Sequence, residues 1–157
     1  MRWFTQNKTP ELQVGSPAPR LPGIDQDGAT IELGALYETD KRVLVYFYPK
    51  ADTPGCTAQA CSIRDEYAVL QEEDVTILGV STDSIKTQKE FQRKYRLPFR
   101  LIADKGGEWA KAFGVPVRLG FTSRQAFLIE EGKIAWLDRK ASTQEQARDV
   151  LRFLGDR

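Results

Sequence analysis

The chain has 157 residues, 41% of them hydrophobic and 29% charged, which is the composition of a globular domain rather than of a disordered or membrane-spanning chain. Lysine and arginine number 23 and aspartate and glutamate 22, so no overall charge favours nucleic acid or an anionic membrane surface as a partner. The longest apolar run, Val43 to Tyr48, is far shorter than the roughly 20 residues that span a bilayer.

The opening residues, MRWFTQNK, lack the charged start, apolar stretch and small-residue cleavage site of a secretory signal, so we expect a cytoplasmic protein. Disulfides in that reducing compartment are usually transient and catalytic rather than structural. The two cysteines, Cys56 and Cys61, are therefore the first candidates for chemistry.

Residues 1 to about 40 are rich in proline and glycine, which favours turns and short strands. We expect residues 1–13 to be a short N-terminal extension, and a small hairpin to form around Thr30 to Leu33. Because no repeat or linker divides the remainder, we predict one domain over residues 1–157.

Two continuous apolar runs, Val43 to Tyr48 and Val75 to Val80, predict buried strands. Between them, apolar residues recur at helical spacing up to about Glu73. Two unalternating strands joined by a helix form a βαβ unit, in which the strands are parallel and the sheet is covered on both faces.

The second half of the chain continues with helices and strands. The predicted elements are a helix from Asp83 or Ser84 to about Arg96, a short strand near Leu101 and Ile102, a hairpin of residues 125–129 and 133–137, and a helix over about 143–154. Together the elements predict an α/β, thioredoxin-like fold with a mixed central sheet flanked by helices and an N-terminal hairpin extension.

The stretch from Pro49 to Cys61 leaves a buried strand and enters a helix, and ligands of open α/β sheets bind beyond the carboxyl ends of strands. A cysteine in the first helical turn, as predicted for Cys56, faces unpaired backbone N–H groups and the positive end of the helix dipole. Both favour the reactive thiolate. Thr53 supplies a hydroxyl that can donate to sulfur or accept from a bound substrate.

The spacing of the two cysteines limits how they could bond. Residues five apart on a regular helix are separated by roughly 8.7 Å between Cα atoms, whereas a disulfide tolerates about 7 Å at most. If both lie on one helix, a bond between Cys56 and Cys61 requires the first turns to unwind. A reversible catalytic or sensing bond therefore fits better than a permanent cross-link, and simple packing of both cysteines in the core is the remaining alternative.

Other cysteine chemistries lack their partners. The chain has no histidine, which removes the imidazole of a papain-like hydrolase. Two thiolates alone do not complete a four-ligand structural zinc site, so we expect no metal. Four residues separate Cys56 and Cys61, whereas a thioredoxin redox motif has two between its cysteines.

Pro49, Thr53 and Cys56 match the PxxxTxxC signature of peroxiredoxins, and the surrounding FYPK and TPGCT segments resemble the bacterioferritin-comigratory or peroxiredoxin Q subgroup. The likeness extends from VGSPAP, which begins at Val14, through VSTD to RQAFLI, which begins at Arg124. Only about the first dozen residues lie outside it.

The resemblance implies a role for each residue of the motif. Cys56 would be the peroxidatic cysteine and Cys61 the resolving cysteine, while Thr53 and Arg124 orient the peroxide and Pro49 shields the sulfur. An arginine that enters a strand is usually solvated or paired with a carboxylate, so the assignment of Arg124 depends on the resemblance.

The resemblance also implies an activity. The chain would reduce hydrogen peroxide and organic hydroperoxides without a cofactor, through an intramolecular disulfide recycled by thioredoxin or a glutaredoxin-like reductant, as a monomer or weak homodimer. The subgroup commonly has a glutamate where this chain has Gln59 and a phenylalanine where it has Ile63, and neither difference removes a reacting group.

Two other functions use the same cysteines. A general thiol–disulfide oxidoreductase would react with protein disulfides rather than with peroxide. A non-enzymatic redox sensor would use the disulfide only to change the shape of the helix for a partner.

Overall fold

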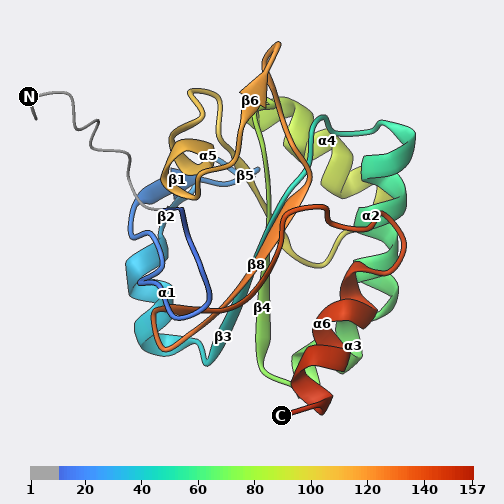
Figure 1. Ribbon diagram of the computed structural model, residues 1–157. Helices are drawn as coiled ribbons and strands as arrows, with labels where there is room; N and C mark the ends of the chain where they lie inside the picture. The colour runs from blue at the N-terminus through green and yellow to red at the C-terminus, as the bar shows by residue number, and fades with distance from the viewer. Residues whose placement is uncertain (1–10) are drawn as a thin grey trace, which may run out of the picture.

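The computed structural model describes residues 11–157, so most of the expected extension over residues 1–13 lies outside the described residues. A five-stranded sheet lies at the centre, in the order β5-β4-β3-β8-β9 (Figure 1). Its strands are β3 (Arg42–Phe47), β4 (Val75–Ser81), β5 (Arg100–Ala103), β8 (Gln125–Glu130) and β9 (Lys133–Asp138). β3, β4 and β5 are parallel to one another, whereas β8 pairs antiparallel with both β3 and β9, and the predicted mixed sheet is confirmed.

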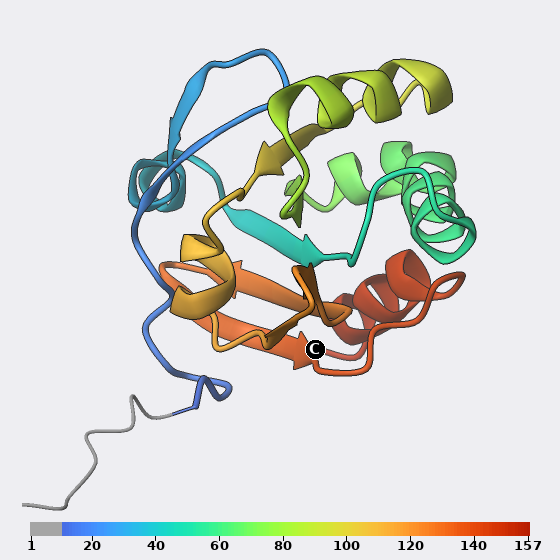
Figure 2. The same cartoon turned by 90° about the horizontal axis from the view of Figure 1, so that it is seen from above.

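Helices cover both faces of this sheet (Figure 2). One layer holds α2 (Pro54–Asp65), α3 (Tyr67–Glu72), α4 (Ile85–Tyr95) and α6 (Gln146–Gly155), and the other holds α1 (Leu33–Thr39) and α5 (Glu108–Ala112). Because successive side chains of a strand point to opposite faces, Tyr46 packs under the first layer and Phe47 under the second. The continuous apolar run of β3 thus reflects a strand with two covered faces.

Most of the predicted elements are present with shifted ends. The helix expected to reach Glu73 is divided into α2 and α3, because Glu66 leaves helical geometry with φ −100° and ψ 10°. Ser84 is the N-cap of α4, since its hydroxyl accepts from the Thr87 N–H at 3.2 Å. The last helix begins at Gln146 rather than near 143, because the Ser142 hydroxyl accepts from the Glu145 N–H and forms a turn before it.

Both predicted hairpins form. β1 (Pro22–Ile24) pairs with β2 (Thr30–Glu32), and β8 pairs with β9 through a turn in which Glu131 and Gly132 have positive φ values of 51° and 74°. That geometry matches the right-handed twist of the two strands. The sequence patterns did not predict α1, α5 or the small hairpin of β6 (Val117–Arg118) and β7 (Phe121–Thr122).

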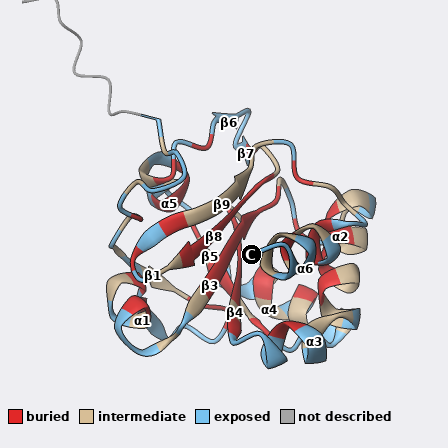
Figure 3. Ribbon diagram, turned by 60° about the horizontal axis from the view of Figure 1, so that its bottom comes forward, coloured by how far each residue is buried: buried red, intermediate tan, exposed pale blue. Residues whose placement is uncertain are grey.

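Burial follows the layers, since β3, β4 and β8 are largely buried, whereas the edge strand β9 is mostly half-buried and the helices expose their outer faces (Figure 3). Within residues 11–157, no helix has both the length and the apolar character needed to cross a membrane.

Candidate active site

Cys56 lies beyond the carboxyl end of β3, as the third residue of α2. Pro54 begins the helix, where its fixed φ suits the first turn and its missing N–H is not needed. Thr53 is the N-cap residue, but its side chain makes no capping hydrogen bond. The backbone N–H groups of the first turn are therefore not satisfied by a cap, and Cys56 lies at the positive end of the helix.

The loop before α2 is held by two carboxylates. The Ala51 N–H donates to Asp83 at 2.8 Å, so Asp83 anchors this loop rather than capping α4. Asp52, which has a positive φ of 60°, accepts from Lys94 at 2.8 Å and from the Tyr95 hydroxyl at 2.6 Å. These hydrogen bonds, with that from Lys94 the larger, hold the pKa of Asp52 below its usual range.

Arg124 reaches Cys56 from the start of β8. Its Nη2 atom lies 3.6 Å from the Cys56 sulfur, although the two residues are 68 positions apart. A Cβ atom at Gly55 would lie 3.0 Å from the same Nη2, so glycine leaves room for the guanidinium against the first turn. The structure thus brings together the cysteine and the arginine that the sequence singled out.

Gln59 holds the other side of the guanidinium. Arg124 Nη1 donates to Gln59 Oε1 at 2.7 Å, and Gln59 Nε2 donates to Gln146 Oε1 at 2.6 Å. The glutamine that replaces the usual glutamate therefore still contacts the arginine, and it does so without a negative charge. Gln146 was missed from sequence, although a glutamine on the apolar stripe of Ala147 and Val150 is a signal that could have found it.

Thr53 does not contact the sulfur through a hydrogen bond. Its hydroxyl donates to the Lys50 carbonyl at 2.8 Å. A hydroxyl has one hydrogen, so of the two roles predicted for Thr53, donation to sulfur or acceptance from a bound peroxide, this conformation leaves acceptance. Pro49 is half-buried at the start of the same loop, and its shielding of Cys56 stays a prediction.

Both cysteines are free thiols on α2, with Cys56 only 1% exposed and Cys61 half-buried. Cys56 is thus enclosed among the buried residues between α2 and the sheet. Because both residues belong to one helix, a bond between them requires part of α2 to unwind.

Two tyrosines, Tyr46 of β3 and Tyr48 just after that strand, lie beneath this helix. Burial raises the pKa of Tyr46 well above its usual range, and the neighbouring Tyr48 and Cys56 add to the shift. Burial also raises the pKa of Tyr48, whose hydroxyl donates to Gln88. Both phenols therefore stay neutral near pH 7, and neither supplies a base.

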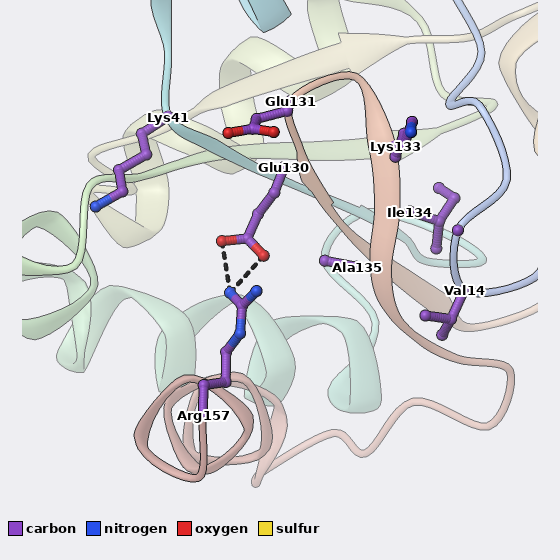
Figure 4. A pocket seen from close by; sticks show the side chains of 9 residues that line it. Val14, Lys41, Glu130, Glu131, Lys133, Ile134, Ala135 and Arg157 are labelled. Carbon is purple, nitrogen blue, oxygen red and sulfur yellow. Dashed lines mark hydrogen bonds and ion pairs between the residues drawn. The ribbon is translucent and has the colours of Figure 1, made fainter.

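A separate hollow of about 400 Å³ lies at the opposite end of the sheet, where β3 begins (Figure 4). Lys41, Glu130 and Arg157 are among its lining residues, and the Glu130 carboxylate accepts from Arg157 and, at 2.8 Å, from Arg42. It is not part of the Cys56 site. Among residues 11–157, no group of three or more histidine, cysteine, aspartate or glutamate side chains is gathered to hold a metal ion.

Comparison with known proteins identifies relatives over most of the chain. The profile of the AhpC/TSA family matches residues 14–137. Peroxiredoxin Q, chloroplastic, from rice (Oryza sativa subsp. japonica) is 39% identical over 126 residues, which are 79% of this chain and 57% of the rice protein. The chain thus spans little more than half the length of that relative.

Solved structures agree over nearly the full length. Peroxidoxin BcpB from Mycobacterium tuberculosis superposes with a TM-score of 0.86 at 30% identity, covering 93% of this chain and 98% of that one. The bacterioferritin comigratory protein of Xanthomonas campestris, described as having alkyl peroxide reduction activity, gives a TM-score of 0.81 at 27% identity and covers 92% and 96%. These similarities, together with a cysteine at the start of α2 beside Arg124, establish that the chain belongs to the AhpC/TSA family and, within it, to the peroxiredoxins of the Q or bacterioferritin-comigratory group.

Proposed function

We propose that this chain is a thiol-dependent peroxidase that reduces hydrogen peroxide and organic hydroperoxides at Cys56. The observation that carries the proposal is the guanidinium of Arg124, 3.6 Å from a cysteine sulfur at the N-terminus of α2. A positive side chain and the helix dipole both favour thiolate over thiol. The thiolate is the form of cysteine that attacks a peroxide.

In the first step, the Cys56 thiolate attacks one oxygen of the peroxide O–O bond. An S–O bond forms, the O–O bond breaks, and the departing oxygen takes a proton to leave as water or an alcohol. Arg124 stabilises the negative charge that develops on this oxygen. Thr53 accepts a hydrogen bond from the O–H of the bound hydroperoxide, because its own hydrogen is given to Lys50.

In the second step, the Cys61 thiol reacts with the sulfenic acid on Cys56. An S–S bond forms and water leaves, and this step requires the first turns of α2 to unwind. An external dithiol, thioredoxin or a glutaredoxin-like protein, then reduces the disulfide by thiol exchange and is itself oxidised. The net reaction converts one peroxide and one dithiol into an alcohol or water, a second water and a disulfide.

The setting of the enzyme is part of the proposal. Two free cysteines fit a reducing compartment, and we assign the chain to the cytoplasm. We assign residues 1–157 to one domain, which acts as a monomer or weak homodimer.

Substitution of the two cysteines tests the mechanism. Stopped-flow mixing with hydrogen peroxide should show rapid stoichiometric oxidation of the unsubstituted chain and none for Cys56→Ser. Cys61→Ser should undergo one oxidation per chain without turnover with thioredoxin. Mass spectrometry of peptides after one equivalent of peroxide should locate the bond between Cys56 and Cys61.

The rival functions give different results in the same assays. Fast exchange with protein disulfides together with slow reaction with peroxide would indicate a general oxidoreductase. A single oxidation with no turnover by any dithiol would indicate a sensor. Peroxide consumption by Cys56→Ser at the unsubstituted rate would refute the assignment of the reacting thiol.

A further inference from the structure

We propose that Gln146, the first residue of the C-terminal helix, is a positioning residue that acts through Gln59 to aim Arg124 at Cys56. The inference deepens the proposed peroxidase function and rests on it. α6 lies against α2 in the helix layer that carries the cysteines (Figure 1).

Gln146 is fully buried, with an exposed fraction of 0%. Its Oε1 accepts from Gln59, while its Nε2 has no hydrogen-bond partner among residues 11–157. An apolar side chain of the same size would fill this space without leaving a buried N–H group unsatisfied. The amide thus costs stability, and a role for its oxygen explains why an amide is there.

The role follows from the direction of the hydrogen bonds. Arg124 has only donors, so Gln59 must present its oxygen to the guanidinium and its Nε2 to the other side. The oxygen of Gln146 accepts that Nε2 at 2.6 Å. Because Arg124 can only donate, it selects this orientation of Gln59, and the hydrogen bond to the buried Gln146 then holds the Gln59 amide in place against the guanidinium.

The segment that leads into α6, residues 141–145, also approaches Arg124 and the neighbouring Gly55. The Ala141 N–H donates to the Arg124 carbonyl at 3.1 Å. The Thr143 methyl would lie 3.5 Å from a Cβ at Gly55, beside Arg124 Nη2. Ala141 therefore holds the backbone of the arginine, and Gln146 acts on its side chain through Gln59. Both glutamines are neutral, so they fix the guanidinium without cancelling its charge.

The test measures how readily Cys56 ionises, in a Cys61→Ser background so that one thiol reacts. The other titratable or charged neighbours are Arg124, Tyr46 and Tyr48, and burial keeps the two phenols neutral. In Gln146→Met, the midpoint of the curve of iodoacetamide alkylation against pH should rise by about one pH unit as Arg124 loses its orientation. The rate of oxidation by hydrogen peroxide at pH 7 should fall roughly tenfold.

Two further variants separate positioning from packing. Val150→Ala removes a fully buried side chain from the same helix, so it should lower the melting temperature without moving the alkylation midpoint. Gln146→Asn keeps an amide but withdraws its oxygen by one methylene, and it should move the midpoint in the same direction as Gln146→Met. It provides the measurement if Gln146→Met does not fold.

A double-mutant cycle tests whether Gln146 acts through Gln59. The chain with both Gln59→Met and Gln146→Met should be no slower than the chain with Gln59→Met alone. Additive effects, or a midpoint that stays in place in both Gln146 variants, would overturn the proposal. A midpoint that moves in a chain that peroxide does not oxidise would leave the positioning role in place and refute the peroxidase function instead.

Discussion

The two ends of the central sheet use arginine in opposite ways. At the end where β3 begins, Arg42 and Arg157 both bind the Glu130 carboxylate, so each guanidinium there has a carboxylate partner. At the end where α2 begins, Arg124 contacts a sulfur and an amide oxygen, and it has no carboxylate partner within residues 11–157. Both ends are held by hydrogen bonds, but only at the Cys56 end does the arginine lack a carboxylate partner among residues 11–157.

The cluster around Glu130 stabilises the fold, whereas the arginine beside Cys56 can change the ionisation of a side chain or ligand. A compensated ion pair presents little net field to its surroundings, whereas a fixed and uncompensated guanidinium favours a nearby anion. The chain places the second kind of arginine beside its buried cysteine. The following predictions test whether the charge of Arg124, rather than its hydrogen bonds alone, determines how fast Cys56 is oxidised.

The largest effect is expected from removal of the free charge. Arg124→Ala should slow oxidation of Cys56 by hydrogen peroxide on the order of 100-fold at pH 7, because both thiolate and departing oxygen lose a charged donor. Stopped-flow fluorescence or competition with a reference peroxidase measures this rate. Arg42→Ala, at the compensated end, is the matched control and should leave the rate within about twofold. Equal losses in both variants would show that the two ends do not differ in this way.

The fold was predictable from sequence where the pattern was local. The runs of β3 and β4 and the stripe on α6 each reflect burial of neighbouring residues. The short hairpin of β6 and β7 was missed because each strand has only two residues, too few for an alternating pattern, and the apolar residues Val117 and Phe121 are exposed. α1 was missed because the proline and glycine of the preceding residues favoured turns throughout the segment.

The site was predictable only where a motif marked it. Cys56 could be placed at a helix start from the adjacent Pro54 and Gly55, but the position of Arg124 depended on the resemblance. The hydrogen bond from Gln59 to Gln146 joins residues 87 positions apart, and no local pattern specifies such a pair. The direction of the Thr53 hydroxyl was also beyond sequence, because a sulfur and a carbonyl oxygen compete for it.

The second prediction concerns a substitution that gives Arg124 a carboxylate partner, as the arginines at the opposite end of the sheet already have. Gln59→Glu would place a carboxylate against Arg124 where the amide oxygen now lies at 2.7 Å. The guanidinium should stay in place while its charge is compensated, so the rate of peroxide oxidation at pH 7 should fall by roughly three- to tenfold. The rate should approach that of the unsubstituted chain in alkaline solution, where the thiolate forms in either case. A constant ratio of the two rates from pH 6 to pH 9 would contradict the electrostatic explanation.

The third prediction concerns the stability of the compensated end. Burial by itself would raise the pKa of Glu130, but the hydrogen bonds from Arg157 and Arg42 outweigh it and hold the pKa below its usual range. A lowered carboxyl pKa stabilises the folded state above the unfolded value, near 4.3, and this contribution is lost as pH falls through the folded value. Glu130→Gln should therefore lower the free energy of unfolding at pH 7 by about 2 kcal/mol.

The difference in stability caused by Glu130→Gln should shrink as the pH is lowered from 5 to 3, which urea denaturation at each pH measures. The other ionisable side chains that line this hollow are Lys41, Glu131 and Lys133, and the substitution leaves them unchanged. Oxidation of Cys56 by peroxide should not change, because the substituted residue lies at the far end of the sheet. A loss of stability that is the same at pH 3 and pH 7 would mean that packing, not charge, explains it.

The smallest effect is expected at the loop that precedes α2, where Asp52 is exposed and its bonds to Lys94 and Tyr95 are weakened by water. Asp52→Asn keeps the size of the side chain and the tolerance for positive φ, so the loop should retain its path. We expect the peroxide rate to change by less than about twofold, with faster amide hydrogen exchange confined to residues 50–55. A tenfold slower rate would show that exposed charge also sets reactivity here, and the contrast between the two ends of the sheet would then no longer depend on Arg124 alone.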